Sequence, residues 1–246
     1  MKFKDLFSSQ ANDYAKYRPT YPEALYEYVA SLSADRTLAW DAGTGNGQAA
    51  VELARFFDAV VATDPSEKQL KEATVSARVE YRCATAEDSG LSAGSVALIT
   101  VAQAFHWFDQ PKFYAEVKRV AKPGAALVVW SYGNASVNAV VNRIVENLYE
   151  KILGSYWDKG RKLVEEGYRH EKFPFAELPP PSFAMQAEWS ADEMLGYLGT
   201  WSALAKYKKE QGRDPRELIE EELRGAWGND PKKVTWPLAV RAFRIS

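Results

Sequence analysis

The segment from Asp41 to Gly47 has the residue types and the spacing of a nucleotide-binding turn. It follows an apolar run, residues 38–40, and leads into a helix-compatible stretch, residues 48–57. Its three glycines stand at alternate positions and are Gly43, Gly45 and Gly47. A second acid, Asp64, ends the next apolar run. Strand, glycine turn, helix, strand and acid together predict a nucleotide-binding half of an α/β sheet.

The spacing of this turn indicates which nucleotide it suits. The dinucleotide fingerprint is G-x-G-x-x-G, whereas the spacing here is G-x-G-x-G. The carboxylate of Asp41 would repel a pyrophosphate and would suit a ligand with an ammonium group. Asp64 stands where an acid accepts hydrogen bonds from ribose hydroxyls. A ligand with a ribose and an ammonium group but no phosphate is S-adenosylmethionine. The alternative is a tight strand-to-helix turn that binds no ligand.

The same turn resembles the D-x-G-x-G-x-G loop of class I S-adenosylmethionine-dependent methyltransferases of the type 11 group. Further matching segments extend along most of the chain. They are residues 7–19 (FSSQANDYAKYRP), 102–109 (AQAFHWFD), 122–124 (KPG) and 197–203 (YLGTWSA). The set is similar to the small-molecule enzymes that include the fungal trans-aconitate methyltransferases. This resemblance implies a class of substrate rather than one substrate.

The resemblance also implies where the cofactor is held. Asp41 is expected to hold its ammonium group, directly or through water, unless it is only a turn acid at a helix start. Asp64 is expected to bind the ribose hydroxyls. Thr85 stands where many relatives have an acid that accepts from the adenine amino group, which leaves the adenine contact open. The other expected cofactor contacts are Gly43, Thr44, Gly45, Pro65, Ala86, Gln103, Tyr14 and Arg18.

The residues after the fourth expected strand are those that this fold places near the transferable methyl group. His106 is a candidate general base for a substrate hydroxyl, because the unperturbed pKa of histidine is near neutrality. The alternative is a structural histidine, and a carboxylate acceptor would need no base. His106, Trp107 and Trp130 are the candidate substrate-binding residues. No metal site is expected, since Asp109 has no clustered acid or histidine.

Alternating apolar strands and amphipathic helices must position these residues. Strands are expected at 37–41, 59–63, 79–83, 96–102 and 125–130, and helices at 23–32, 47–57, 66–76 and 111–120. Repeated β-α units predict a Rossmann-like three-layer α/β/α sandwich. The expected sheet is mostly parallel and seven-stranded, with an antiparallel last strand at 234–245. Residues 134–166 are helical in pattern, and residues 182–189 alternate as a strand does.

One methyltransferase domain is expected over residues 1–246. Its parts are an N-terminal lid and helix (1–34), a cofactor-binding core (35–132), and helical cap insertions with the final strands (133–246). A chain of 246 residues can bury a sizeable core in one domain.

Composition limits the partners. The net charge is −2 and the basic residues are scattered, so no nucleic-acid-binding face is expected. No apolar run approaches the length of a membrane span. The lone Cys83 excludes an internal disulfide and fits a reducing, cytoplasmic compartment. The expected partner is a small-molecule substrate, either a carboxylic acid or an apolar metabolite, and the chain is expected to be a monomer or a homodimer.

Two other function classes remain open at the level of sequence. A nicotinamide-dependent oxidoreductase is disfavoured by the glycine spacing and by Asp41. A non-catalytic S-adenosylmethionine-binding protein would share the loop but would have no productive acceptor site.

Overall fold

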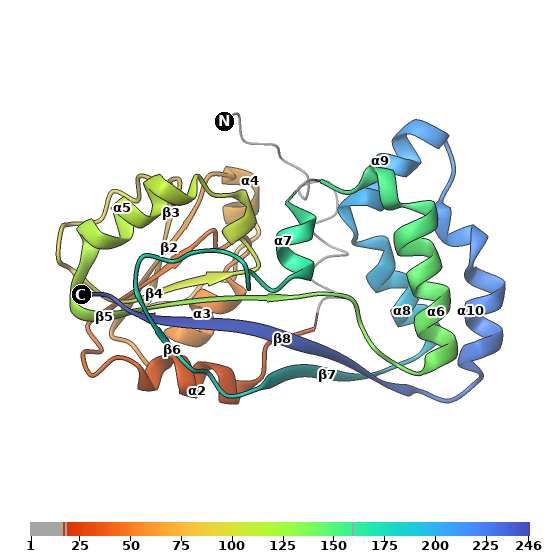
Figure 1. Ribbon diagram of the computed structural model, residues 1–246, viewed down its shortest axis with the longest axis horizontal. Coiled ribbons are helices and arrows are strands. Elements are labelled where there is room, and N and C mark those ends of the chain that lie inside the picture. Colours follow the sequence, from red (N-terminus) through yellow and green to blue (C-terminus); the bar gives the residue numbers. More distant parts are fainter. Residues whose placement is uncertain (1–16, 18, 159) are drawn as a thin grey trace.

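A single mixed sheet forms the centre of the molecule (Figure 1). The computed structural model describes residue 17, residues 19–158 and residues 160–246. The strand order is β3-β2-β1-β4-β5-β8-β6, with β7 also paired to β8. The strands are β1 (Leu38–Ala42), β2 (Ala59–Asp64), β3 (Val79–Cys83), β4 (Val96–Ala102), β5 (Ala121–Tyr132), β6 (Ala176–Leu178), β7 (Phe183–Trp189) and β8 (Lys232–Arg244).

Strand direction confirms the predicted topology. β1 to β5 are parallel to one another, and β8 is antiparallel to β5. β6 and β7 pair with opposite ends of the same edge of β8, so the eight strands of the described ranges fill seven positions across the sheet. Three consecutive prolines, 179–181, separate β6 from β7. Proline has no N–H to donate to a ladder, which explains why this edge strand is divided in two.

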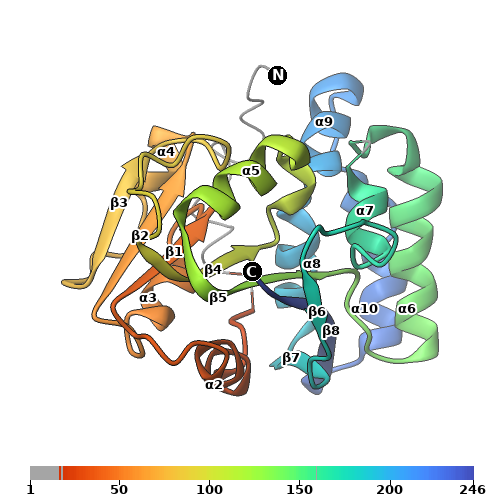
Figure 2. The same ribbon diagram turned by 60° about the vertical axis from the view of Figure 1, so that its left-hand side comes forward.

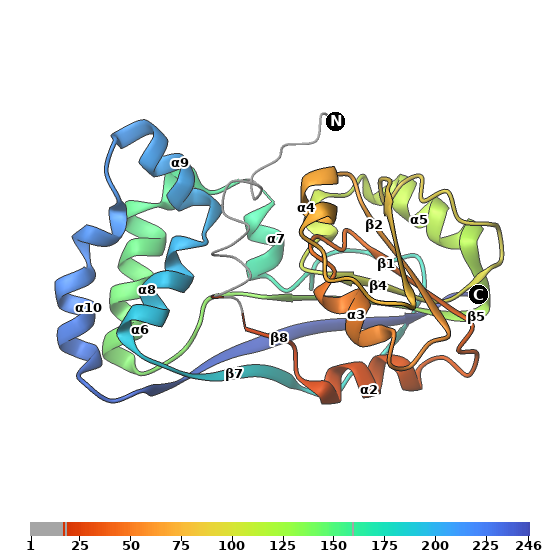
Figure 3. The same cartoon turned by 180° about the vertical axis from the view of Figure 1, so that it is seen from behind.

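Helices cover both faces of the sheet, as the predicted three-layer arrangement requires. On one face α2 (Glu23–Ser31) and α3 (Gln48–Leu53) share an apolar cluster with the sheet, to which Val29, Leu53 and Val128 belong. On the other face α5 (Gln110–Val120) buries Phe113, Val117 and Val120. Figures 1 and 3 show these two helical layers with the sheet between them.

Two helices begin at serine caps, and several helices end earlier than predicted. The side chain of Ser66 accepts a hydrogen bond from Gln69 N at the start of α4 (Glu67–Lys71), and Ser190 forms a capping box at the start of α8 (Ala191–Gly199). The helix expected over 47–57 ends at Leu53 instead, because residues 54–57 form turns that bury Phe57.

The segment expected to be helical over 134–166 is a series of short pieces. They are α6 (Ala139–Glu146), the π-helical η2 (Asn147–Ile152), the 3-10 turn η3 (Gly154–Tyr156) and α7 (Arg161–Glu165). Gly154 and Gly160 lie in the breaks, where glycine disfavours helix. With α8, α9 (Ser202–Gln211), η4 (Pro215–Leu218) and α10 (Glu220–Trp227), most of these pieces form a helical cap beside the sheet (Figure 2).

The cap shares two strands with the sheet. In β8, Val234 and Trp236 belong to the apolar cluster of the cap, whereas Ala242 belongs to that of the sheet. β7 is divided in the same way, because Met185 packs in the cap cluster and Phe183 packs against the sheet cluster. Both strands therefore run without a break from one part of the molecule into the other (Figure 1).

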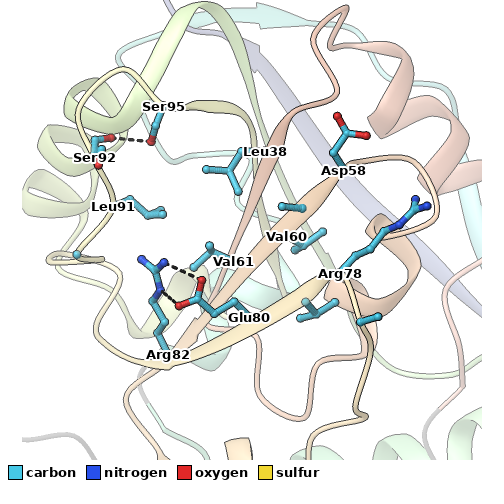
Figure 4. Close-up of a pocket in the computed structure, with 14 residues that line it drawn as sticks. Leu38, Asp58, Val60, Val61, Arg78, Glu80, Arg82, Leu91, Ser92 and Ser95 are labelled. Carbon is cyan, nitrogen blue, oxygen red and sulfur yellow. Dashed lines mark hydrogen bonds and ion pairs between the residues drawn. The ribbon is translucent and has the colours of Figure 1, made fainter.

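The connection from β3 to β4, residues 84–95, contains no helix. Part of the sheet is therefore covered only by this loop, and a hollow of about 510 Å³ lies there (Figure 4). Glu80 and Arg82, both on β3, line the hollow and form a two-point ion pair with each other at 2.7 and 2.8 Å (Figure 4). Leu38 and Ala59, the first residues of β1 and β2, also line the hollow, so it is separate from the carboxyl ends of these strands.

Within the described ranges, no helix is both long and apolar enough to cross a membrane.

Candidate active site

Most of the predicted cofactor residues lie at the carboxyl ends of neighbouring parallel strands. Strand register places Asp41 of β1 beside Thr100 of β4, and Asp64 of β2 beside Cys83 of β3. Ala102, at the end of β4, pairs with Trp130 of β5. This edge is where ligands bind in open α/β sheets. Tyr14 and Arg18, which were also predicted to contact the cofactor, lie outside the described residues.

Asp64 connects the two turns of the predicted nucleotide site. Its Oδ2 accepts a hydrogen bond from Gly45 N at 2.9 Å, and its Oδ1 accepts one from Ser66 N at 2.9 Å. A carboxylate can accept several hydrogen bonds, so a vicinal diol at this edge can donate to the same group. The position and the acceptor capacity of Asp64 fit a ribose.

The glycine turn leaves open space for a ligand at one of its glycines, Gly45. Gly45 has φ +59°, and a Cβ built there meets nothing within 4 Å. Gly43 has φ +69° but is enclosed by the protein, because its Cβ would lie 2.6 Å from Cβ of Ala104. Gly43 is thus required for packing, whereas Gly45 faces open space that a ligand can fill. The turn is anchored by Thr63, whose carbonyl accepts from Gly43 N and Thr44 N at 2.8 and 3.0 Å.

Asp41 is completely buried beneath this turn. Its Oδ2 accepts from the Thr44 hydroxyl at 2.6 Å, and its Oδ1 accepts from the Thr100 hydroxyl at 2.7 Å. Burial raises the pKa of Asp41 to about 6; the two hydroxyls oppose the rise, and the nearby charge of Asp64 adds to it. Of the two predicted contacts with an ammonium group, this geometry favours the indirect one, through Thr44 or a water molecule.

Gln103 ends β4 in a conformation that few residues adopt. Its φ is +55°, and its side chain continues the sheet: Oε1 accepts from Tyr132 N at 2.9 Å and Nε2 donates to Tyr132 O at 3.2 Å. Its own N–H donates to Trp130 O at 2.9 Å. A non-glycine residue held in this region costs on the order of 1–3 kcal/mol, which the surrounding contacts must offset. Gln103 therefore gives the floor of the site a defined shape.

His106 lies in the 3-10 turn η1 (Phe105–Trp107), directly after this floor. Its Nδ1 is 3.0 Å from the hydroxyl of Tyr168. Burial, with a smaller contribution from the positive charge of Arg161, lowers the pKa of His106 to about 3, and Asp158 opposes the shift. The ring is therefore neutral at physiological pH, and its low affinity for a proton makes it a weak general base.

The two tryptophans that were predicted to bind substrate differ in accessibility. The side chain of Trp107 is 41% exposed beside His106. Trp130 is fully buried in the cluster beneath α2, with the ring of Tyr21 at 5.5 Å. The prediction for Trp130 is corrected to a packing role, because its side chain points to the α2 face of the sheet.

The predicted adenine turn is less well defined. After β3, Thr85 is exposed and bridges to Asp88, whereas Ala86 is buried in the cluster beneath α5. Pro65 is half-buried after β2, and its carbonyl lies 3.7 Å from the exposed Sγ of Cys83. The role of these residues in binding adenine stays a prediction.

A group of residues that the sequence did not reveal packs beside His106. A Cβ on Gly160, just before α7, would lie 3.2 Å from the carbonyl oxygen of His106. The guanidinium of the next residue, Arg161, lies 4.9 Å from the ring centre of Trp157 and 5.2 Å from that of Tyr149. Trp201 contacts both of these rings. We call Tyr149, Trp157, Arg161 and Trp201 the junction cluster, because it lies where the cap meets the site.

Comparison with known proteins identifies the family to which this chain belongs. The family model described as "Methyltransferase domain" matches residues 40–129, which include the glycine turn, Asp64 and His106. The fold and the site thus define a class I S-adenosylmethionine-dependent methyltransferase. A Dictyostelium discoideum protein classed as a methyltransferase is 38% identical over 232 residues, covering 92% of this chain and 88% of its own length. The chain therefore belongs to the methyltransferase family, and S-adenosylmethionine is its cofactor.

Two further relatives support the same assignment. A structure from Anaeromyxobacter dehalogenans, described as a type II methyltransferase, is 44% identical, with a TM-score of 0.86 over 93% of this chain and 98% of that one. An uncharacterized methyltransferase of Mycobacterium tuberculosis is 35% identical over 129 residues, 51% of each chain. These relatives rule out the nicotinamide oxidoreductase that the sequence left open.

Proposed function

We propose that the methyl acceptor is a small molecule, and specifically a carboxylic acid with an apolar body. The observation that carries this proposal is Arg161, a cation 19% exposed beside the reactive edge of the sheet. Its Nε donates to the hydroxyl of Tyr149 at 2.5 Å and its Nη2 donates to Asn134 Oδ1 at 3.3 Å. Among the described residues no partner is recorded for Nη1, so the guanidinium retains donors for a carboxylate.

The surroundings of Arg161 favour an acceptor that is both anionic and apolar. The aromatic rings of the junction cluster offer apolar and cation–π contacts next to this charge. Glu165 is 3.8 Å from Arg161 Nε and also accepts from Tyr149, which orients the phenol and the guanidinium together. A neutral apolar metabolite, the other acceptor that the sequence suggested, would leave the remaining donors of Arg161 unused.

The residues of the chain have separable tasks in this reaction. Asp64, Gly45 and the buried Asp41 hold the cofactor at the edge of the sheet, and the cofactor supplies an electrophilic methyl group on a sulfonium sulfur. Arg161 would bind and orient the acceptor carboxylate. Such an acceptor is already ionised near neutral pH, so no side chain needs to remove a proton. This agrees with the low pKa of His106.

The remaining predictions about this chain are retained as part of the proposal. They are a single domain, a cytoplasmic location, action on small molecules rather than nucleic acid, a monomeric or homodimeric state, and the narrower resemblance to the trans-aconitate type. The free, exposed Cys83 supports a reducing compartment.

An acceptor screen tests the proposed substrate class. The protein is incubated with methyl-labelled S-adenosylmethionine and a panel of aliphatic and aromatic carboxylic acids, each paired with its amide and its alcohol. We expect label to appear as a base-labile ester, with the acids only. Transfer to alcohols, amides or amines but not to acids would contradict the carboxylate assignment and would leave the methyltransferase assignment intact.

A further inference from the structure

Tyr168 is the direct neighbour of His106, and neither the sequence nor the relatives assign it a role. It follows α7, and its hydroxyl is 3.0 Å from His106 Nδ1. Its ring is completely buried, and it packs edge-on against Phe105 with the ring centres 5.2 Å apart. The contact thus links η1 at the end of β4 to the segment that returns from the cap.

The main chain of Tyr168 has an unfavourable conformation, which its hydrogen bonds stabilise. Its φ is +57°, in the left-handed region, and Gly167 before it has φ +59°. The carbonyl of Tyr168 accepts from Arg241 Nη1 at 2.7 Å, and its N–H donates to Leu163 O at 3.0 Å. Tyr168 and Gln103 are the two non-glycine residues with positive φ in the described ranges, and both lie next to His106. Backbone strain of this kind concentrates at functional sites.

The chemistry of the two groups decides which of them donates across the 3.0 Å contact. A phenol O–H is a stronger hydrogen-bond donor than the N–H of a neutral imidazole, and an unprotonated imidazole nitrogen is a stronger acceptor than a phenol oxygen. The hydrogen bond is therefore expected to run from the Tyr168 hydroxyl to Nδ1 of His106.

We infer that Tyr168 is a positioning residue that donates its proton to Nδ1 of His106 and thereby keeps the imidazole proton on Nε2. His106 then offers an N–H donor at the site instead of a lone pair. That donor orients an oxygen of the methyl acceptor, and His106 does not deprotonate it. The orienting role rests on the proposed function, whereas the tautomer of His106 does not.

The electrostatic surroundings keep this arrangement neutral. Burial raises the pKa of the Tyr168 phenol, so it remains a proton donor at physiological pH. His106 has a pKa of about 3, and the groups that act on it from the segment around α7 are the cation Arg161 and the anion Asp158. Neither partner of the hydrogen bond is expected to change its charge between pH 5 and pH 8.

The tautomer can be measured without any acceptor. The chain has two histidines, and His170 is exposed, so His170→Gln leaves His106 as the single imidazole. In the ¹⁵N-histidine-labelled protein, long-range ¹H–¹⁵N correlations identify the protonated ring nitrogen. We expect Nε2 to be protonated, Nδ1 to be unprotonated, and the spectrum to stay unchanged from pH 5 to pH 8. A proton on Nδ1, or a charged ring at pH 6, would overturn the inference.

A variant then shows whether Tyr168 is the cause. In Tyr168→Phe combined with His170→Gln, we expect a mixture of the two tautomers and a titration moved to higher pH. An unchanged Nε2–H tautomer in a folded variant would show that Tyr168 does not set it. With an active acceptor, Tyr168→Phe should raise the KM for that acceptor several-fold while cofactor affinity stays constant. If no acceptor is ever methylated, the proposed function fails, but the spectrum still decides the tautomer.

Discussion

The Asp64 carboxylate accepts the main-chain N–H of Gly45 at 2.9 Å, and so joins the end of the second strand to the turn after the first. The same carboxylate accepts Ser66 N at 2.9 Å, which holds the start of the next helix. One side chain thus holds both turns of the proposed cofactor site and is also its proposed ribose-binding acid. Stability and cofactor binding should therefore both respond to its replacement.

Replacing Asp64 by alanine should weaken cofactor binding by roughly 1–3 kcal/mol, because charge-assisted hydrogen bonds to the ribose are lost. Calorimetry with S-adenosylhomocysteine measures this effect without turnover. Asp64→Asn is the matched control, since it keeps the size of the side chain and an acceptor oxygen, and its loss should be smaller. Unchanged affinity in a folded Asp64→Ala protein would refute the ribose assignment.

Gly45→Ala should separate ligand binding from folding. Its Cβ meets no protein atom, so the cost to the fold is limited to alanine at φ +59°, roughly 1–2 kcal/mol. We expect cofactor binding to be lost as well, because the Cβ occupies the space that the ligand needs. Gly94→Ala is the control, since Gly94 has φ +61°, also faces open space, and lies in the loop before β4. Equal cofactor affinity in the two variants would contradict the proposal that the cofactor fills the space beside Gly45.

Asp41 should make both stability and cofactor affinity depend on pH. Its pKa is about 6 in the folded protein against an ordinary value of 3.8, so the native state binds the extra proton. The free energy of unfolding should therefore fall by about 3 kcal/mol through this group as pH rises from about 3 to about 7. Denaturant unfolding of Asp41→Asn should lack this component. The difference between the two proteins isolates it from the other carboxylates.

The same residue should couple protonation to binding. A cofactor ammonium group near Asp41 favours the ionised carboxylate, so wild-type affinity for S-adenosylhomocysteine should increase as pH rises through 6. In Asp41→Asn, calorimetry from pH 5 to pH 7.5 should show weaker binding and a flatter pH profile. A parallel pH dependence in the two proteins would exclude Asp41 as its source.

Arg161→Gln should affect the acceptor and not the cofactor. If the acceptor is a carboxylate, removal of this partly buried cation should raise the KM for the acceptor about tenfold or more, about 1.4 kcal/mol. Lys162→Gln removes the same charge from the next residue of α7, where the side chain is 78% exposed, and should change little. Initial-rate kinetics at saturating cofactor compare the two. Similar effects of both variants would indicate a long-range electrostatic effect of the positive charges on α7, and not a specific contact between Arg161 and the acceptor.

The sequence predicted the central strands well because they are buried on both faces. β4 is such a continuous apolar run, and the expected span 96–102 agrees with it to the residue. The span 79–83 also agrees with β3, although this edge strand is only partly buried and carries Glu80 and Arg82. Helix ends were less predictable. The apolar pattern that suggested a helix through residue 57 comes from a turn that buries Phe57, and periodicity alone does not distinguish the two. The breaks around Gly154 and Gly160 depend on how the cap packs.

The two halves of the site were not equally predictable. The turn around Asp41, Gly45 and Asp64 depends on local chemistry, which a short motif carries. Trp130 is buried because its side chain lies on the face of the sheet that α2 covers. Tyr168 contacts His106 only because the chain returns from the cap to the sheet. Sixty-two residues separate those two side chains, and no local pattern marks the contact.

The strands that the cap shares with the sheet limit how the enzyme can open. Because β7 and β8 each pass unbroken from one apolar cluster into the other, the cap cannot swing as a rigid body about a flexible hinge without breaking a paired ladder. Acceptor entry and product release must therefore depend on short-range movements of loops and side chains around the junction cluster. Turnover should accordingly be more sensitive to the local rigidity of residues 153–158 than to solvent viscosity, which would slow a movement of the whole cap.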